Sequence, residues 1–301
     1  MEFHQLRYFL AVARDGNFSR AAERCHVSQP SLSQQIQKLE EELGEKLFSR
    51  LKRQTILTTA GEALVPRALR ILNEADAARQ DVADSARLVR GRVTIGILPT
   101  IAPYLLPQVL LLAAKQCPAV EIIIHEEPTA RLLAMGLACD IDLAVLSIFP
   151  TDERFFVEKI HEEELLLALP QGHALTTRRS VKMGDLESER FILMKEGHCL
   201  GDQALHLCSR HDLQPAVVFR SAQLETIQAL ITAGAGVSLI PAMARQRGRA
   251  ASPHYRSLAH PRPSRPINLA WRKEHHQSKA TLEFIRLVYE AIATLKRRQE
   301  S

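Results

Sequence analysis

Beyond Arg92 the sequence alternates between short apolar runs and stretches of helical periodicity. Helical patterns cover 101–115, 130–136 and 224–233. Between them stand runs with the length and aliphatic content of strands, at 93–97, 120–124, 141–146, 165–169, 191–194, 216–219 and 237–240. This alternation predicts an α/β domain with parallel sheets covered by helices on both faces. Because 301 residues are enough for more than one core, the preceding residues are expected to fold separately.

The first 60 residues predict three helices. Apolar residues at a spacing of three and four predict a helix over 2–14, and Ser19 is expected to cap a short second helix. Ser28 is expected to cap the third helix and Gly44 to end it. The leading residues of this third helix are small or carry amides, which suits contacts with base edges and phosphates in the major groove of DNA. They are Gln29, Ser31, Ser33, Gln34 and Gln35.

A basic hairpin is predicted to follow the third helix. Arg50, Lys52 and Arg53 come before the run 54–58, and the cations of such a wing can contact phosphates. The net charge of +5 and the isoelectric point near 9.0 permit an anionic partner. Two other interpretations remain open from this pattern: a solvated turn for the hairpin, and a helical pair that packs on another element.

Residues 61–89 have a long helical pattern with a narrow apolar stripe. A helix of this kind between two units predicts a dimerising linker that belongs to no compact core. The sequence therefore predicts three parts: a DNA-binding domain at 1–60, a linker helix at 61–90 and a regulatory domain at 91–301.

Several classes of protein are disfavoured by what the sequence lacks. No apolar run reaches the roughly 18 residues of a membrane span and residues 1–6 resemble no export signal, so we expect a cytoplasmic protein with no membrane partner. The phosphate-binding patterns G-x-G-x-x-G and G-x-x-x-x-G-K-[ST] are absent, so no cofactor is expected. The five cysteines are odd in number, which disfavours a secreted disulfide framework. Cys25, Cys117 and Cys139 are interpreted as packing residues.

The segment 196–208 carries the most informative chemistry of the chain. It follows a predicted strand and opens a helix, so Cys199 is expected near a helix N-terminus, where the dipole favours a thiolate. His198 adds a hydrogen-bond donor or a positive charge, whereas Asp202 opposes the thiolate but can orient a polar substrate. Hydrogen peroxide attacks an accessible thiolate of low pKa to give a sulfenic acid. The segment therefore predicts a redox-sensing thiol.

The spacing of Cys199 and Cys208 predicts a conformational switch. Nine positions correspond to a rise of roughly 13 Å along a helix, whereas the Cα atoms of a disulfide lie within about 7 Å. A disulfide between them therefore requires the helix to unwind. Two other interpretations remain open: buried thiols without a redox role, and a metal site that also uses His198, His206 and His211 but lacks the usual ligand spacings.

Five N-terminal stretches resemble the DNA-binding domain of the LysR family: FSRAA at 18–22, VSQPSLS at 27–33, IQKLE at 36–40, LFSR at 47–50 and LTTAG at 57–61. The resemblance implies a winged helix-turn-helix that forms a dimer. It places Gln29, Pro30, Ser33 and Gln34 at DNA-contacting positions, and Arg50 and Arg53 in the wing. With Ser31 from the pattern above, these residues are the candidate contacts to double-stranded DNA.

Beyond residue 91 the chain resembles LysR-type effector domains. This resemblance implies two α/β lobes, as in periplasmic binding proteins of type II. The chain is expected to cross between lobes near 161–164 and to return near 263–266, which places 267–301 in the first lobe. Ligands or reactive groups in such folds lie between the lobes.

The segment around Cys199 resembles the peroxide-sensing members of the LysR family, in GHCL at 197–200, DQA at 202–204 and Cys208. That resemblance implies that hydrogen peroxide oxidises Cys199 and that Cys208 resolves the product. Gly201 departs from the family, which usually carries Arg there, and loss of the charge is expected to raise the thiol pKa and slow the reaction. The implied peroxide pocket consists of Thr100, Thr129, His198, Asp202 and Arg265.

A regulator of this kind is expected to be an activator and to assemble as a dimer or homotetramer. RNA polymerase and a thiol reductant such as glutaredoxin or thioredoxin are its expected partners, with hydrogen peroxide as the signal. Two alternatives remain open: a LysR-type regulator that binds a small organic effector between the lobes, and a thiol peroxidase fused to a DNA-binding domain. Because peroxide reduction by Cys199 would be stoichiometric, no enzyme is expected.

Overall fold

The chain of the computed structural model divides into two compact units, each with its own hydrophobic core. The described residues are 1–51, 54–83, 89–246, 252–274 and 277–300. Among the helices in these ranges, none combines the length and the hydropathy that crossing a lipid bilayer requires. The units are Met1–Arg87 with Glu274–Ser278, and Leu88–Lys273 with Lys279–Ser301.

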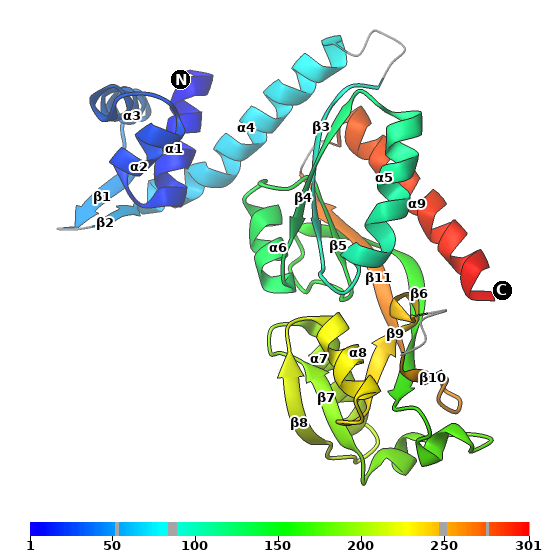
Figure 1. Ribbon diagram of the computed structural model, residues 1–301. Coiled ribbons are helices and arrows are strands. Elements are labelled where there is room, and N and C mark those ends of the chain that lie inside the picture. Colours follow the sequence, from blue (N-terminus) through cyan, green and yellow to red (C-terminus); the bar gives the residue numbers. More distant parts are fainter. Residues whose placement is uncertain (52–53, 84–88, 247–251, 275–276, 301) are drawn as a thin grey trace. The chain divides into compact units, whose positions relative to one another are not determined.

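The N-terminal unit contains a helix-turn-helix followed by a short antiparallel hairpin (Figure 1). Its elements are α1 (Phe3–Asp15), α2 (Phe18–Arg24), α3 (Gln29–Leu43), β1 (Phe48–Leu51), β2 (Gln54–Leu57) and the long helix α4 (Thr59–Ala83). The predicted helices and hairpin are therefore confirmed, and Gly44 ends α3 in the left-handed conformation expected of a C-terminal glycine.

The starts of α2 and α3 follow from their capping residues, with one correction. Ser28 Oγ accepts the backbone amide of Ser31 at 3.3 Å and so caps α3, as predicted. The prediction that Ser19 caps α2 is wrong. Asn17 caps this helix, and its side-chain oxygen accepts the amides of Ser19 and Arg20 at 2.8 and 3.1 Å. Since Asn17 already satisfies these first amides, α2 begins one residue before Ser19.

The first half of α4 contributes to the core of the N-terminal unit. Ala68 and Leu72 are buried in the same apolar cluster as Phe9 of α1 and Leu32 of α3. The expectation that the stripe of this helix belongs to no compact core is therefore wrong for that half. The helical repeat brings these positions onto α1, where burying apolar surface is more favourable than leaving it in water.

The first lobe of the larger unit is built on parallel strands (Figure 1). The central strand β3 pairs with β4 on one side and β5 on the other. The strands and the helices of this lobe are β3 (Gly91–Ile97), β4 (Val120–Glu126), β5 (Leu143–Leu146), α5 (Ala102–Gln116), α6 (Thr129–Leu137) and α9 (Lys279–Glu300). Val93, Ile95 and Ile97 of β3 are fully buried, so this strand lies at the centre of the lobe's core.

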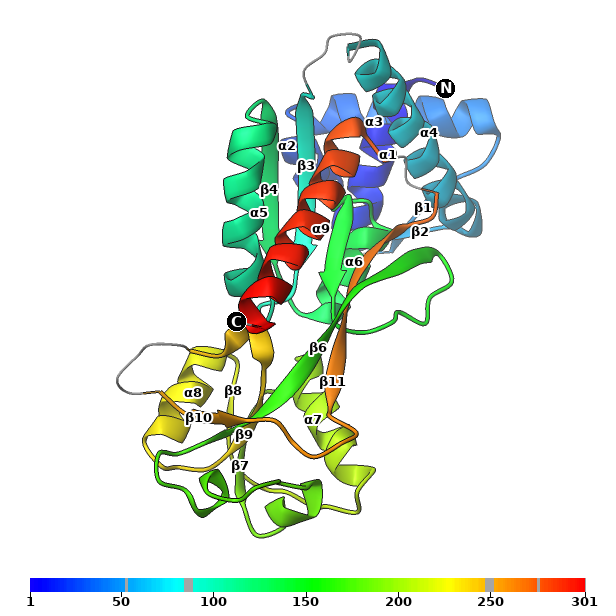
Figure 2. The ribbon, with the colours of Figure 1, turned by 90° about the vertical axis from the view of Figure 1, so that its right-hand side faces the viewer.

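Two long antiparallel strands join the first lobe to the second (Figure 2). β6 (Phe155–Leu169) leaves the first lobe and β11 (Ser264–Arg272) returns to it, with Ser264 opposite Glu164. The predicted crossing points therefore face each other. The prediction of parallel sheets holds for β3, β4 and β5 but not for the whole sheet, because β11 runs antiparallel to β5 and joins the sheet of the first lobe. A strand that returns directly across a lobe connection must run against its neighbour.

The second lobe has a parallel strand pair and an apolar cluster of its own. Strands β9 and β10 pair with β6 and so connect this lobe to the crossing strands. Its elements are β7 (Arg190–Met194), β8 (Ala216–Ser221), β9 (Ser238–Pro241), β10 (His254–Arg256), α7 (Cys199–Ser209), α8 (Leu224–Thr232) and the 3₁₀ turns η1 (Ala174–Thr176), η2 (Met183–Leu186) and η3 (Ala242–Ala244).

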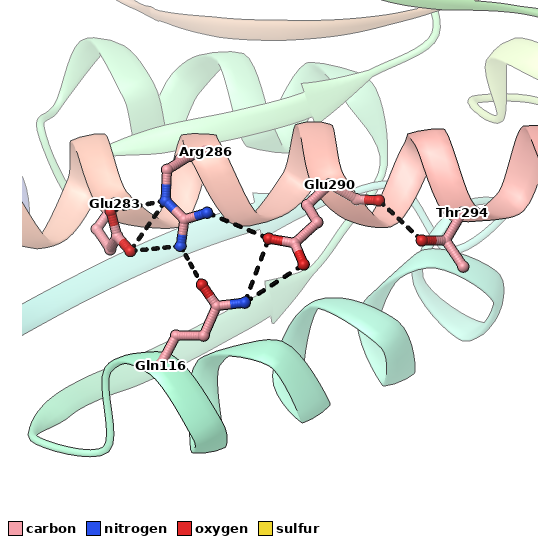
Figure 3. A network of polar contacts seen from close by, with 5 residues as sticks. All are labelled: Gln116, Glu283, Arg286, Glu290 and Thr294. Carbon is pink, nitrogen blue, oxygen red and sulfur yellow. Dashed lines mark hydrogen bonds and ion pairs between the residues drawn. The ribbon is translucent and has the colours of Figure 1, made fainter.

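A polar network fastens the C-terminal helix to the first lobe (Figure 3). Arg286 of α9 pairs with Glu283 at 2.6 Å and with Glu290 at 3.1 Å, and it donates to the side-chain oxygen of Gln116 at the end of α5. The Gln116 amide in turn donates to Glu290 at 3.2 Å. Together with β11, this helix returns the end of the chain to the first lobe, as predicted.

Candidate functional site

Cys199 is the first residue of α7, just after the turn that leaves β7. Gly197 in that turn has a φ of +88°, which favours glycine, and His198 takes the extended N-cap position without a side-chain capping bond. The Leu200 amide donates a hydrogen bond to the Cys199 sulfur. The predicted place of Cys199 at a helix N-terminus is confirmed, and the helix dipole there favours negative charge.

The Cys199 side chain is buried in the core of the first lobe, although α7 belongs to the second. Only 8% of the residue is exposed. Burial raises the pKa of the thiol above its ordinary value, while Arg265, the Thr129 hydroxyl and the Leu200 amide lower it and Asp202 raises it. The expectation of an accessible thiolate with a low pKa is wrong for this conformation. Desolvation of the thiolate outweighs the guanidinium and the helix N-terminus.

A fully buried guanidinium lies beside the thiol. Arg265 donates from Nε to Glu163 Oε2 at 2.8 Å, from Nη1 to Thr100 Oγ1 at 3.0 Å and from Nη2 to the Thr100 carbonyl at 3.1 Å. Neither member of the Arg265–Glu163 pair has any exposed side-chain surface. The other oxygen of Glu163 accepts the Met243 amide at 2.6 Å. These bonds hold the guanidinium in place and compensate for its desolvation.

Thr129 begins α6 and turns its hydroxyl toward the same site. Its oxygen is buried and has no hydrogen-bond partner of regular geometry among the described residues. It nevertheless lies close enough to the Cys199 sulfur to lower the thiol pKa. Such groups are rare, because leaving a buried polar group unpaired costs about 1–3 kcal/mol. A hydroxyl of this kind beside a thiol and a guanidinium suits a small polar molecule that hydrogen-bonds to all three.

His198 and Asp202 flank Cys199 on α7. Burial and the nearby charge of Lys195 lower the pKa of His198, which favours the neutral imidazole at neutral pH. The positive charge that the sequence suggested at this position is therefore disfavoured, although a neutral ring still donates one hydrogen bond. Asp202 is exposed, and its charge raises the Cys199 pKa, as expected.

Cys208 lies in the core of the second lobe with 1% of the residue exposed. Burial raises the pKa of its thiol to about 11. At roughly 100° per residue, nine positions turn Cys208 about 180° away from Cys199, and they add a rise of roughly 13 Å. The two thiols therefore lie on opposite faces of α7, and each is buried in a different core. A metal ion cannot bind both in this conformation.

Two contacts between the lobes flank the buried thiol. Gln203, one turn after Cys199, donates from its side-chain amide to the Ser147 carbonyl at 2.6 Å. Tyr104 of α5 packs on the apolar cluster of the second lobe, and its hydroxyl donates to Glu225 of α8 at 3.3 Å. Burial raises the pKa of Tyr104 far above its ordinary value, so its hydroxyl stays protonated as a donor. These contacts hold α7 and α8 against the first lobe.

The helix-turn-helix presents the predicted leading residues of α3. Gln29, Pro30, Ser31 and Gln34 are exposed, and Ser33 is half-buried. All five remain candidates for contact with DNA. The wing is described only in part, since Arg50 lies in β1 opposite Thr55 whereas Arg53 falls outside the described residues.

Two other polar residues of α3 are used inside the N-terminal unit. The side-chain oxygen of Gln35 accepts the Gln5 amide at 3.3 Å, which ties α3 to α1. Glu40 is buried, and its Oε1 accepts the backbone amides of Leu47 and Phe48 at 2.9 and 3.4 Å. Glu40 is the first of three consecutive glutamates near the end of α3, and its hydrogen bonds fix the start of the wing. The side-chain oxygen of Gln35 is therefore used between the helices, which leaves its amide donors as its candidate groups for base edges.

Two family descriptions match the chain. The LysR substrate binding domain matches residues 86–293, and the bacterial regulatory helix-turn-helix protein of the lysR family matches residues 3–62. The chain belongs to the LysR family. The fold class predicted from the sequence, a helix-turn-helix domain joined to a two-lobed α/β domain, is thereby confirmed.

This LysR-family chain is similar to proteins named OxyR. It is 36% identical over 276 residues to the DNA-binding transcriptional dual regulator OxyR of Escherichia coli K12, with 90% of each chain covered. A full-length OxyR variant from Pseudomonas aeruginosa has a TM-score of 0.77 at 29% identity, covering 97% of this chain and 94% of that one. A hydrogen-peroxide-bound OxyR variant from Corynebacterium glutamicum has a TM-score of 0.66 at 29% identity, covering 99% and 95%.

The LysR-family site contains a close packing contact at Gly201. A Cβ at this position would lie 2.8 Å from the backbone carbonyl oxygen of Met194, at the end of β7. The first turn of α7 therefore sits directly on the strand, and a larger residue requires the helix to move. The sequence suggested only a missing charge at Gly201, whereas the structure adds a steric role.

The structure of this LysR-family chain brings some predicted site residues together and separates others. Cys199, Thr129 and Arg265 meet in one place, and Thr100 joins them through its bonds to Arg265. Cys208 lies in the other core.

Sequence reasoning missed Glu163, Gln203 and Ser147. Glu163 lies directly opposite Arg265 on the neighbouring strand. This pairing depends on the register of β6 and β11, which the local sequence does not show. The Gln203–Ser147 contact joins residues that are 56 positions apart, so no local pattern points to it.

Proposed function

We propose that this chain is a transcription activator that senses hydrogen peroxide with Cys199 and binds double-stranded DNA with α3 and the wing. One observation carries the proposal: a buried thiol at a helix N-terminus lies beside the Arg265 guanidinium and the buried hydroxyl of Thr129. Similarity over 90% of both chains to a protein named as the DNA-binding regulator OxyR supports it.

The proposed sensing chemistry has two steps, an oxidation of Cys199 and a condensation that forms the disulfide. The Cys199 thiolate attacks one oxygen of hydrogen peroxide, the O–O bond breaks, and hydroxide leaves and takes up a proton to become water. Cys199 is thereby oxidised to a sulfenic acid and the peroxide is reduced. The Cys208 thiolate then attacks the sulfenic sulfur, hydroxide leaves as water after protonation, and the disulfide forms. Glutaredoxin or thioredoxin, each supplying two thiols, reduces the disulfide again.

The residues around Cys199 have complementary roles in this proposal. Arg265 stabilises the thiolate and the hydroxide that leaves, because its charge faces both in a desolvated site. The hydroxyls of Thr129 and Thr100 hydrogen-bond the two peroxide oxygens. His198 and Asp202 flank the thiol and orient the incoming peroxide.

The disulfide step converts a chemical signal into a change of shape. Because Cys199 and Cys208 lie on opposite faces of α7 and in different cores, closing the bond requires α7 to unwind between them. The Gln203–Ser147 bond lies within this segment and is lost with it. Release of α7 from the first lobe changes how the regulatory domain presents the DNA-binding domain.

The remaining parts of the proposal concern assembly. The DNA-binding domain at 1–60, the linker helix at 61–90 and the regulatory domain at 91–301 form a dimer or homotetramer that recruits RNA polymerase in the cytoplasm. The chain is a regulator and no enzyme, since each oxidised thiol pair waits for a reductant. The DNA contacts come from Gln29, Pro30, Ser31, Ser33, Gln34, Arg50 and Arg53.

Mass spectrometry of the purified reduced protein, before and after one equivalent of hydrogen peroxide, tests the sensing mechanism. Wild-type protein should lose two hydrogens as Cys199 and Cys208 become linked, and hydrogen exchange should increase between them as α7 unwinds. Cys199→Ser should abolish the reaction, and Cys208→Ser should stop at a sulfenic or over-oxidised Cys199. Cys117→Ser is the matched control, because Cys117 is a buried thiol elsewhere in the first lobe.

Two results would each contradict a different part of this proposal. Two free thiols at Cys199 and Cys208 after peroxide treatment, together with unchanged DNA binding, contradict the sensing proposal. Sustained fast turnover of peroxide with a thioredoxin system contradicts the assignment as a regulator alone and favours a peroxidase.

A further inference from the structure

The second lobe contains a pocket that the sensing mechanism does not use. It has a volume of about 520 Å³ and lies between the C-terminal part of α7 and the segment 261–266, which includes the first residues of β11. This volume falls in the range of sites that bind metabolite-sized molecules, and it is larger than a single inorganic ion needs. The side chains that line it on α7 are Gln203, His206, Leu207 and Arg210.

The lining of this pocket is cationic and contains no carboxylate among the described residues. Arg210 and Arg262 contribute guanidiniums, and His206 and His211 contribute imidazole donors. Arg262 is partly neutralised by Glu164 at 3.5 Å. For Arg210, no ion pair is found among the described parts of the chain, so its charge is available to a ligand. Guanidiniums bind carboxylates and phosphates through paired hydrogen bonds.

The rest of the pocket wall is apolar. Leu165 and Leu207 contribute aliphatic surface, and Pro261, Pro263 and Pro266 contribute a wall without free backbone amides. An inorganic anion would leave this surface in contact with water. We propose that the pocket binds a small organic polyanion, with its carboxylate or phosphate groups on Arg210 and Arg262 and its carbon skeleton on the leucines and prolines.

The position of the pocket links the ligand to α7. Gln203, His206 and Arg210 follow Cys199 at intervals of four, three and four residues, so all four lie on one stripe of the helix. An anion held by this stripe and by segment 261–266 is bound only while α7 is helical. If oxidation unwinds α7, as the proposed function requires, the bound anion stabilises the reduced form and opposes closure of the disulfide.

Isothermal titration calorimetry of the reduced full-length protein tests the pocket, with citrate and fructose 1,6-bisphosphate as organic probes of carboxylate and phosphate chemistry. We expect saturable binding of at least one probe at one site per chain. Arg210→Gln should raise the dissociation constant about tenfold or more, because it removes a charged hydrogen-bond donor. Arg220→Gln is the matched control, since it removes an exposed arginine of the same lobe that does not line the pocket.

If neither probe binds, or if wild type and Arg210→Gln have equal dissociation constants, the proposal that this pocket binds an organic polyanion is wrong. The link to α7 is tested by the rate of Cys199–Cys208 disulfide formation with one equivalent of peroxide. A saturating probe should slow it several-fold in wild type and leave it unchanged in Arg210→Gln. If a probe binds but does not change this rate, the bound anion does not stabilise α7 against disulfide formation. If no disulfide forms even without a probe, the sensing proposal fails, and the calorimetric result for the pocket still stands.

Discussion

Helices α3 and α7 both begin at predicted positions, yet their first turns have opposite environments. The first three residues of α3 are all exposed, whereas the first three residues of α7 are all buried. Ser28 caps α3 with a side-chain bond, while the N-cap residue of α7, His198, makes none. The polar start of α3 is available to DNA, and the start of α7 is held by packing in another lobe.

The difference shows which residues supply the functional groups around each helix. The candidate DNA contacts of α3 are supplied by neighbours in the sequence. The thiol at the start of α7 is controlled by Thr129 and Arg265, which lie on other elements far along the chain. Variants of the buried site should therefore change stability and thiol reactivity together, and variants of the exposed site should change only DNA binding.

Removing the guanidinium should have the largest effect. Arg265→Met leaves Glu163 buried without its partner, and we expect the free energy of unfolding to fall by about 3–5 kcal/mol. The Cys199 pKa should rise further, because Arg265 lowers it, while Cys208 should not change. Chemical denaturation and the pH dependence of alkylation measure the two effects. Adding Glu163→Met should restore most of the stability but not the reactivity; recovery of both would contradict the role of Arg265.

At the exposed site, Gln34→Ala should weaken specific operator binding by about 1–3 kcal/mol without changing the free energy of unfolding. Gln35→Ala is the contrasting variant, because its side chain ties α3 to α1. It should lower stability more than sequence discrimination. Gel-shift titrations against specific and random duplexes measure both. If Gln34→Ala loses the same binding affinity for the specific and the random duplex, Gln34 does not contribute to sequence recognition.

The close contact at Gly201 should give a smaller effect on the buried side. In Gly201→Ala the new Cβ meets the Met194 carbonyl, and the strain exceeds the roughly 1 kcal/mol that alanine gains in a helix. We expect a net loss of about 1–2 kcal/mol in unfolding free energy and faster alkylation of Cys199 as α7 shifts. Gly184→Ala is the control, since a Cβ there meets nothing within 4 Å. If Gly201→Ala and Gly184→Ala are equally stable, the first turn of α7 does not pack closely on the Met194 carbonyl of β7.

The alkylation rate of both buried thiols should rise with pH, because both pKa values are raised. Burial disfavours the thiolate, so the reactive form is lost as pH falls and gained as pH rises. In the reduced protein the alkylation rate of Cys208 should rise about tenfold per unit up to pH about 11. The rate for Cys199 should also still be rising above pH 9, because its pKa is raised from the value 9.0. A plateau for Cys199 below pH 8 would show that the thiolate is already favoured.

Most elements of the fold could be predicted from the sequence, because their signals are local. Strand-like runs and capping residues act over a few positions, and they predicted the start of α3 and most of the strands, although only the last third of β6. The exceptions have physical reasons: Asn17 satisfies the amides of α2 before Ser19 can, and the residues of β11 pair with residues that precede them by 100 positions or more. The relation of Cys199 to Cys208 also followed from the helical repeat alone.

The sequence by itself determined that the chain has a helix-turn-helix, a two-lobed α/β domain and a helix with two thiols nine positions apart. Only the tertiary structure decided that these thiols lie in different cores, that Glu163 partners Arg265, and that the pKa of Cys199 is raised. The physical reason is the distance along the chain over which each interaction acts. Capping and periodicity depend on adjacent residues, whereas desolvation depends on every group that packs around an atom, whatever its position in the chain.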